Sequence, residues 1–164
     1  MTKEIIFSLI SCSKTITGKP RKSMYKDKRS NFTLRNDFSC ASIDGEKKFE
    51  IFMRINTEMP TIFSIGLQYQ TESGYVTICR YNGKHMHKNK VDDSDEFNNY
   101  HIHTLFDHQL TDDTEDSIDA IQTDKYISFD EALFAFLTDC GIDDWQTHFP
   151  ELESKINQLK IEGV

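Results

Sequence analysis

Five of the six histidines of this chain lie between residues 85 and 108. An imidazole has an ordinary pKa close to neutral, so a histidine can both take and give a proton at physiological pH. Four of them form two pairs with a spacing of two residues, His85 with His87 and His101 with His103. Because residues i and i+2 of a strand point to the same side, His101 and His103 are predicted to share one face, and His85 and His87 could share one if that segment is extended.

A cation and an amide with the same spacing, Arg80 and Asn82, precede the first pair. The chain between Asn89 and Tyr100 is long enough to fold back, so that two antiparallel strands would bring the groups together. The sequence therefore predicts one polar site with these catalytic candidates: Arg80, Asn82, His85, His87, His101 and His103.

Such a site is compatible with four interpretations. In RNA cleavage without a metal, one histidine takes the proton of the 2′-hydroxyl and another protonates the leaving oxygen, while Arg80 or Lys84 stabilises the phosphorane. Four imidazoles could instead bind zinc or another transition metal, although their spacing is not diagnostic. The cluster could bind RNA or protein without chemistry, or simply hydrogen-bond a loop as scaffold. We expect no metal and no cofactor.

These residues resemble the TumE-like toxins of bacterial toxin–antitoxin modules and related small bacterial and phage proteins. In those toxins a Tyr-Arg-Tyr-Asp strand leads to a histidine pair, and a Pro-His-His-x-His segment follows. The resemblance covers roughly residues 49–105 and implies action on RNA. It matches Arg80 to the family's arginine, Asn82 to its aspartate and the two histidine pairs to its histidines. Asn82 cannot act as a general base, and no proline precedes His101.

The charge of the chain is divided between its two parts. Residues 1–90 hold 16 lysines and arginines against eight acids, whereas residues 91–164 hold three against 19, and the net charge is −8. The basic part could contact nucleic acid, and the acidic part could imitate it in the basic channel of a partner. The second candidate function is therefore a non-enzymatic, anti-CRISPR-like phage or mobile-element inhibitor of a nucleic-acid-processing protein. We expect a protein partner in either case, an antitoxin or a target nuclease.

Alternating apolar residues predict an α+β fold with an antiparallel sheet of about five strands. Helices near both ends are expected to pack on one face of that sheet. The first begins after Thr2, a plausible N-cap, and another follows the capping box formed by Ser128 and Glu131. A polar loop is predicted over residues 84–99.

The length indicates a single domain over residues 1–164, with a mobile basic loop at 11–30 and a mobile acidic loop at 111–119. No apolar run is long enough to cross a membrane, and no signal-peptide pattern opens the chain, so we expect a cytoplasmic protein without membrane contact. The four cysteines are widely spaced and are interpreted as reduced thiols in the core.

Overall fold

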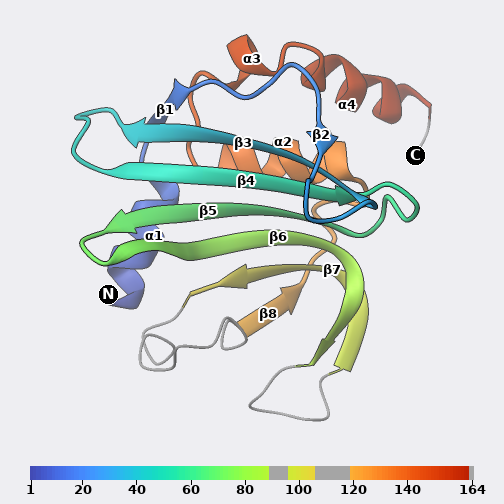
Figure 1. Ribbon diagram of the computed structural model, residues 1–164, viewed down its shortest axis with the longest axis horizontal. Helices are drawn as coiled ribbons and strands as arrows, with labels where there is room; N and C mark the ends of the chain where they lie inside the picture. The colour runs from blue at the N-terminus through green and yellow to red at the C-terminus, as the bar shows by residue number, and fades with distance from the viewer. Residues whose placement is uncertain (89–95, 106–118, 163–164) are drawn as a thin grey trace.

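The computed structural model describes residues 1–88, 96–105 and 119–162, with the backbone alone at 86–88, 96–97 and 119. Within these ranges the chain forms one antiparallel sheet of eight strands (Figure 1). Its order is β1-β3-β4-β5-β6-β7-β8, and β2 pairs with β3 beside β1. The strands are β1 (Lys14–Gly18), β2 (Tyr25–Lys26), β3 (Thr33–Ser42), β4 (Lys48–Asn56), β5 (Phe63–Thr71), β6 (Gly74–Lys88), β7 (Glu96–Thr104) and β8 (Asp119–Gln122).

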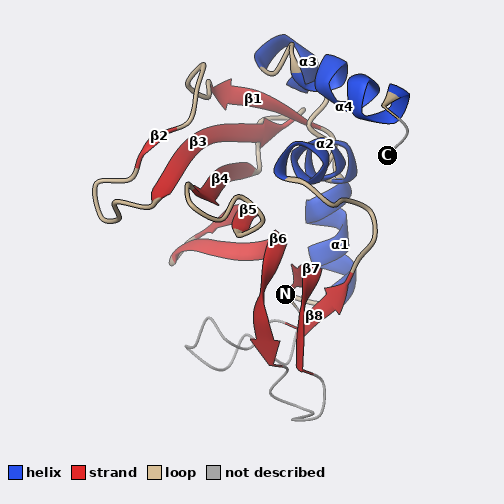
Figure 2. Cartoon of the chain, turned by 90° about the vertical axis from the view of Figure 1, so that its right-hand side faces the viewer, coloured by secondary structure: helices blue, strands red, loops and turns tan. Residues whose placement is uncertain are grey.

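Alternate apolar side chains of the central strands form the core on one face of this sheet. Phe38 pairs with Ile51, Ile51 pairs with Leu67, and all three are buried. Apolar residues of α1 (Lys3–Ser11) and α2 (Phe129–Asp139) belong to the same core. Both helices lie against this side of the sheet (Figure 2). The alternation of the strands thus leaves their polar side chains for the opposite face.

Local signals in the sequence set the ends of the main helices. Thr2 caps α1 by accepting a hydrogen bond from the backbone N–H of Ile5. Ser128 caps α2 in the same way through Glu131, whose carboxylate accepts in turn from the N–H of Ile127. After α2, Gly141 takes a φ of 65°, a left-handed conformation that suits glycine and ends the helix. Two short helices follow, α3 (Trp145–His148) and α4 (Leu152–Ile161).

A buried lysine joins the ends of two helices to the first strand. Lys14 is fully buried, and its ammonium donates hydrogen bonds of 2.8 Å to the carbonyl oxygens of Ile10, Cys12 and Cys140. These carbonyls belong to the C-terminal ends of α1 and α2, where the helix dipole attracts a cation. Its ammonium also lies 4.7 Å from the ring centre of Phe49. Lys14 therefore satisfies backbone groups that the core would otherwise leave without a donor.

The structure corrects three expectations from the sequence. The sheet has eight strands in the described part of the chain instead of about five. The predicted basic loop over residues 11–30 contains β1 and β2, and the predicted polar loop over 84–99 contains the end of β6 and the start of β7. Strand pairing uses backbone groups, so polar side chains do not prevent it. Most of the predicted acidic loop, residues 111–118, lies outside the described residues, and Asp119 begins β8.

Candidate functional site

The candidate residues lie in two neighbouring cross-strand rows on the polar face. The first row follows the strand register through Arg35, Arg54, Ser64, Asn82 and His101. The second row follows it through Asp37, Phe52, Gly66, Arg80 and His103. Residues that pair directly across antiparallel strands point to the same face, so Arg80, Asn82 and the second histidine pair share one side of the sheet.

An irregularity in β6 follows the first row directly. The pairing of β6 with β7 shifts between Asn82 and His85. Gly83 stands in this irregularity, where an added Cβ would lie 2.0 Å from the carbonyl oxygen of Thr61. The hydroxyl of Tyr126 lies 3.0 Å from the carbonyl oxygen of Asn82 and 2.9 Å from that of His101. Glycine permits the close approach, and Tyr126 holds the two strands together on the core side of the site.

Beside this irregularity the rings of three histidines contact one another in a row. The ring centroids of His85 and His101 are 4.6 Å apart, and those of His101 and His103 are 4.9 Å apart. The Nδ1 atom of His101 lies 2.7 Å from the carbonyl oxygen of Asn99. A carbonyl oxygen only accepts, so Nδ1 carries the proton and Nε2 is the basic atom of the neutral ring. The hydrogen bond also fixes the orientation of this imidazole.

Burial divides the cluster into an inner and an outer part. His101 is 0% exposed, His103 is 3% exposed and Asn82 is 2% exposed, whereas Arg80 and His85 are half-buried. A cavity of about 310 Å³ opens beside the outer residues. Its described lining consists of Thr33, Arg54, Ile55, Asn56, Ile62, Phe63, Ser64, Arg80, Asn82 and His85. The two buried histidines therefore support the site from behind. The half-buried Arg80 and His85 are the residues that a ligand can reach, and Asn82 lines the cavity with almost no exposed surface.

The described lining of the cavity contains both polar and apolar side chains. Ser64 pairs with Asn82 across the strands, and both side chains line it between Arg54 and Arg80. Neither the hydroxyl of Ser64 nor the amide nitrogen of Asn82 has a hydrogen-bond partner among the described residues. The described lining contains two arginines and no carboxylate. Hydrogen-bond donors in a lining without a described carboxylate suit an oxygen-rich anion such as a phosphodiester.

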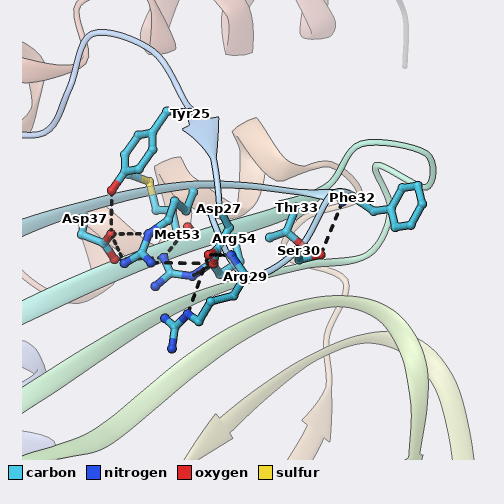
Figure 3. Close-up of polar contacts among 10 residues, drawn as sticks. Tyr25, Asp27, Arg29, Ser30, Phe32, Thr33, Asp37, Met53 and Arg54 are labelled. Atoms are coloured by element: carbon cyan, nitrogen blue, oxygen red, sulfur yellow. Dashed lines mark hydrogen bonds and ion pairs between the residues drawn. The ribbon is translucent and has the colours of Figure 1, made fainter.

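An ion-pair network holds Arg54 beside this cavity (Figure 3). The carboxylate of Asp37 accepts from Arg35 at 2.7 Å and from Arg54 at 2.9 Å. Burial raises the pKa of Asp37, but the hydrogen bonds from the two arginines outweigh burial and bring this pKa below its ordinary value of 3.8. Asp27 lies 3.7 Å from Arg35 and 4.0 Å from Arg54. The network fixes the guanidinium of Arg54 where it lines the cavity.

The structure brings together five of the six predicted site residues and leaves one undecided. The shared face of Arg80, Asn82, His101 and His103 is confirmed by the register, and His85 joins them through its ring contact. The backbone of His87 pairs with that of Phe97, while its side chain lies outside the described atoms. The alternative cation, Lys84, points to another neighbour, since its ammonium lies 5.3 Å from the ring centre of Tyr100.

Sequence reasoning missed several residues of the site, namely Arg54, Ser64 and Tyr126. Arg54 and Ser64 belong to strands that carry no histidine, and only the register places them in the same row as Asn82. Their alternation with apolar residues in β4 and β5 was the available signal, because it assigns them to the polar face. Of the two remaining histidines, His148 lies 3.5 Å from Asp144, and His108 falls outside the described residues.

Within the described ranges, no group of three or more histidine, cysteine or acidic residues is arranged to hold a metal ion. No described helix has the length and apolar character that crossing a membrane requires. Comparison of the chain with protein-family models, characterised proteins and solved structures finds no match.

Proposed function

We propose that this chain is a toxin-like cytoplasmic protein that acts on RNA as a metal-independent ribonuclease. The observation that carries the proposal is the cavity that Arg80, Asn82 and His85 line together. It combines a cation, an amide donor and an imidazole without a carboxylate among its described lining. These groups are suited to a phosphodiester whose charge grows in the transition state. The resemblance to TumE-like toxins leads to the same class of substrate.

The reaction that these residues fit is the internal transfer of the RNA phosphate. His85 takes the proton of the 2′-hydroxyl while this oxygen forms a bond to phosphorus. Arg80 donates hydrogen bonds to the non-bridging oxygens and stabilises the phosphorane. The bond from phosphorus to the 5′-oxygen then breaks, and this oxygen receives the proton from His85. The products are a 2′,3′-cyclic phosphate end and a 5′-hydroxyl end, so atoms and protons balance without a co-reactant.

The buried histidines have a positioning role in this scheme. His101 is fully buried, so it reaches the substrate only through the ring of His85, 4.6 Å away. Its own orientation is fixed by the hydrogen bond to Asn99. This arrangement refines the scheme in which two histidines both contact the RNA, and one proton carrier is sufficient for the transfer described.

The direct test is incubation of the purified protein with a mixed pool of RNA in the presence of EDTA. We expect fragments with 2′,3′-cyclic phosphate ends, and we expect His85→Ala and Arg80→Ala each to slow cleavage by about 100-fold or more. His148→Ala is the matched control, because it removes a histidine on α3 that lies outside the site. Cleavage by His85→Ala at the wild-type rate would contradict the proposal.

The alternative function is a non-enzymatic inhibitor, and the charge of the chain favours it. Residues 91–164 hold only three lysines and arginines against 19 acids. A strongly acidic surface could occupy the basic channel of a nucleic-acid-processing protein. If no RNA is cleaved, and if the chain instead binds a purified nuclease with a strong dependence on salt, the inhibitor is the better interpretation.

A further inference from the structure

The end of β2 and the turn that joins it to β3 adjoin the candidate site and carry several exposed basic residues. Lys26, Lys28 and Arg29 are all exposed, and the side chain of Arg29 is 81% accessible. Phe32 follows on the same turn with 52% of its surface exposed. We refer to these four residues as the basic turn. Proteins bind single-stranded nucleic acids through exposed cations and exposed aromatic rings together. The cations contact the phosphates, and a base stacks on the ring.

The basic turn borders the cavity directly. The residue after Phe32 is Thr33, which lines the cavity, and the backbone N–H of Thr57 donates to the carbonyl oxygen of Phe32 at 2.8 Å. Beneath the turn, Asp27 lies 4.0 Å from Arg54, which is also part of the lining. A polynucleotide with one phosphate in the cavity would therefore meet the basic turn with its neighbouring nucleotides.

Hydrogen bonds within the turn hold it in shape. The carboxylate of Asp27 accepts from the backbone N–H of Arg29 at 3.0 Å, and the N–H of Asp27 donates to the carbonyl oxygen of Thr33 at 2.9 Å. Figure 3 shows Arg29 and Phe32 projecting from this turn in different directions. An ordered backbone loses little freedom on binding, so mainly the side chains of the turn have to be ordered by the ligand.

We propose that the basic turn binds single-stranded RNA beside the cavity, with phosphates on Lys26, Lys28 and Arg29 and an unpaired base stacked on Phe32. This inference rests on the proposed function, because it names the substrate form that the same site receives. The bases of a duplex are already stacked on one another and cannot lie on Phe32. The substrate class is therefore single-stranded rather than double-stranded RNA.

Binding is measured with a fluorescent, 2′-O-methylated 12-nucleotide strand, which lacks the 2′-hydroxyl and cannot be cleaved by the proposed reaction. We expect Phe32→Ala to weaken binding by about tenfold, and Tyr75→Ala, an exposed aromatic at the far end of β6, to leave it unchanged. Alanine at Lys26, Lys28 and Arg29 together should reduce the slope of log affinity against log salt by about two. The charge-matched control carries alanine at Lys48, Lys155 and Lys160, which are exposed elsewhere.

The outcomes separate the inference from the proposed function. Equal binding of the single strand and of its blunt duplex, or equal effects of Phe32→Ala and Tyr75→Ala, would overturn the inference even if RNA is cleaved. If the wild type binds the strand through the basic turn but cleaves no RNA, the inference stands and the ribonuclease activity is rejected.

Discussion

The imidazole rings of His85 and His101 lie edge to face, with centroids 4.6 Å apart and an angle of 62° between their planes. One ring borders the cavity, and the other is fully buried. We therefore expect His101→Ala to lower the free energy of unfolding by about 1–3 kcal/mol, because it removes a buried, hydrogen-bonded side chain. His85→Ala should change it by only about 0.5 kcal/mol. Urea unfolding of both variants measures the difference. Equal losses of unfolding free energy would contradict the division into a buried His101 and an outer His85.

Gly83 is predicted to tolerate no side chain. The Cβ of an alanine would lie 2.0 Å from the carbonyl oxygen of Thr61 and 2.9 Å from the backbone nitrogen of Phe63, so the backbone must move. We expect Gly83→Ala to cost about 1–3 kcal/mol of stability, as overpacking does, and to displace Asn82 and His85. Gly45→Asn is the control, since nothing lies within 4 Å of a Cβ there and asparagine tolerates its φ of 76°. Urea unfolding that matches wild type would show that the bend accepts a side chain.

Lys14 is expected to be essential for the junction of the two helices. Lys14→Met keeps most of the volume of the side chain but leaves three carbonyl oxygens without their donor. The free energy of unfolding should fall by about 3 kcal/mol or more, since buried acceptors that lose their partner cost about 1–3 kcal/mol each. Chemical denaturation compares it with Lys48→Met, a change at an exposed lysine. If both variants lose the same amount of unfolding free energy, Lys14 has no special role in joining the two helices.

Phe136 and Leu133 test the packing of α2 on the sheet. Phe136 is fully buried and meets the ring of Tyr81 edge to face at 5.4 Å, and Leu133 is 5% exposed. Phe136→Ala and Leu133→Ala should each destabilise the protein by about 2–5 kcal/mol. Thr138→Ala, at an exposed position of the same helix, should have little effect. Thermal melting that superimposes on wild type for either core variant would show that α2 is not packed as described.

The ion pairs of Asp37 predict a specific dependence of stability on pH. Its pKa in the folded protein lies below the ordinary value of 3.8, so the charged carboxylate favours folding. This contribution is complete above the unfolded-state pKa and is lost as the pH falls through the lower, folded-state pKa. The stability gap between wild type and Asp37→Asn should therefore shrink on acidification below about pH 4. Urea unfolding at several pH values measures it, with Glu72→Gln at the exposed turn before β6 as control. A constant gap would contradict the prediction.

Local patterns in the sequence determined the helices and the sharing of faces. The hydroxyl of Ser128 and the carboxylate of Glu131 act through neighbours close along the chain, so their spacing alone indicates where α2 begins. The spacing of two residues likewise places His101 and His103 on one side of any strand that contains them. Both inferences depend on contacts between residues a few positions apart, and the order of the amino acids specifies such contacts directly.

Tertiary structure alone decided which residues face a ligand. Sequence could not show that His101 would be buried behind His85, because burial depends on the curvature of β6 and on the register across five strands. It also gave no sign that Lys14 would be buried, since a lysine is ordinarily exposed and only the meeting of two helix ends supplies its three acceptors. Arg54 and Ser64 reached the site through strand pairing. Backbone hydrogen bonds make these pairings between segments far apart in the chain, and no local pattern of side chains specifies them.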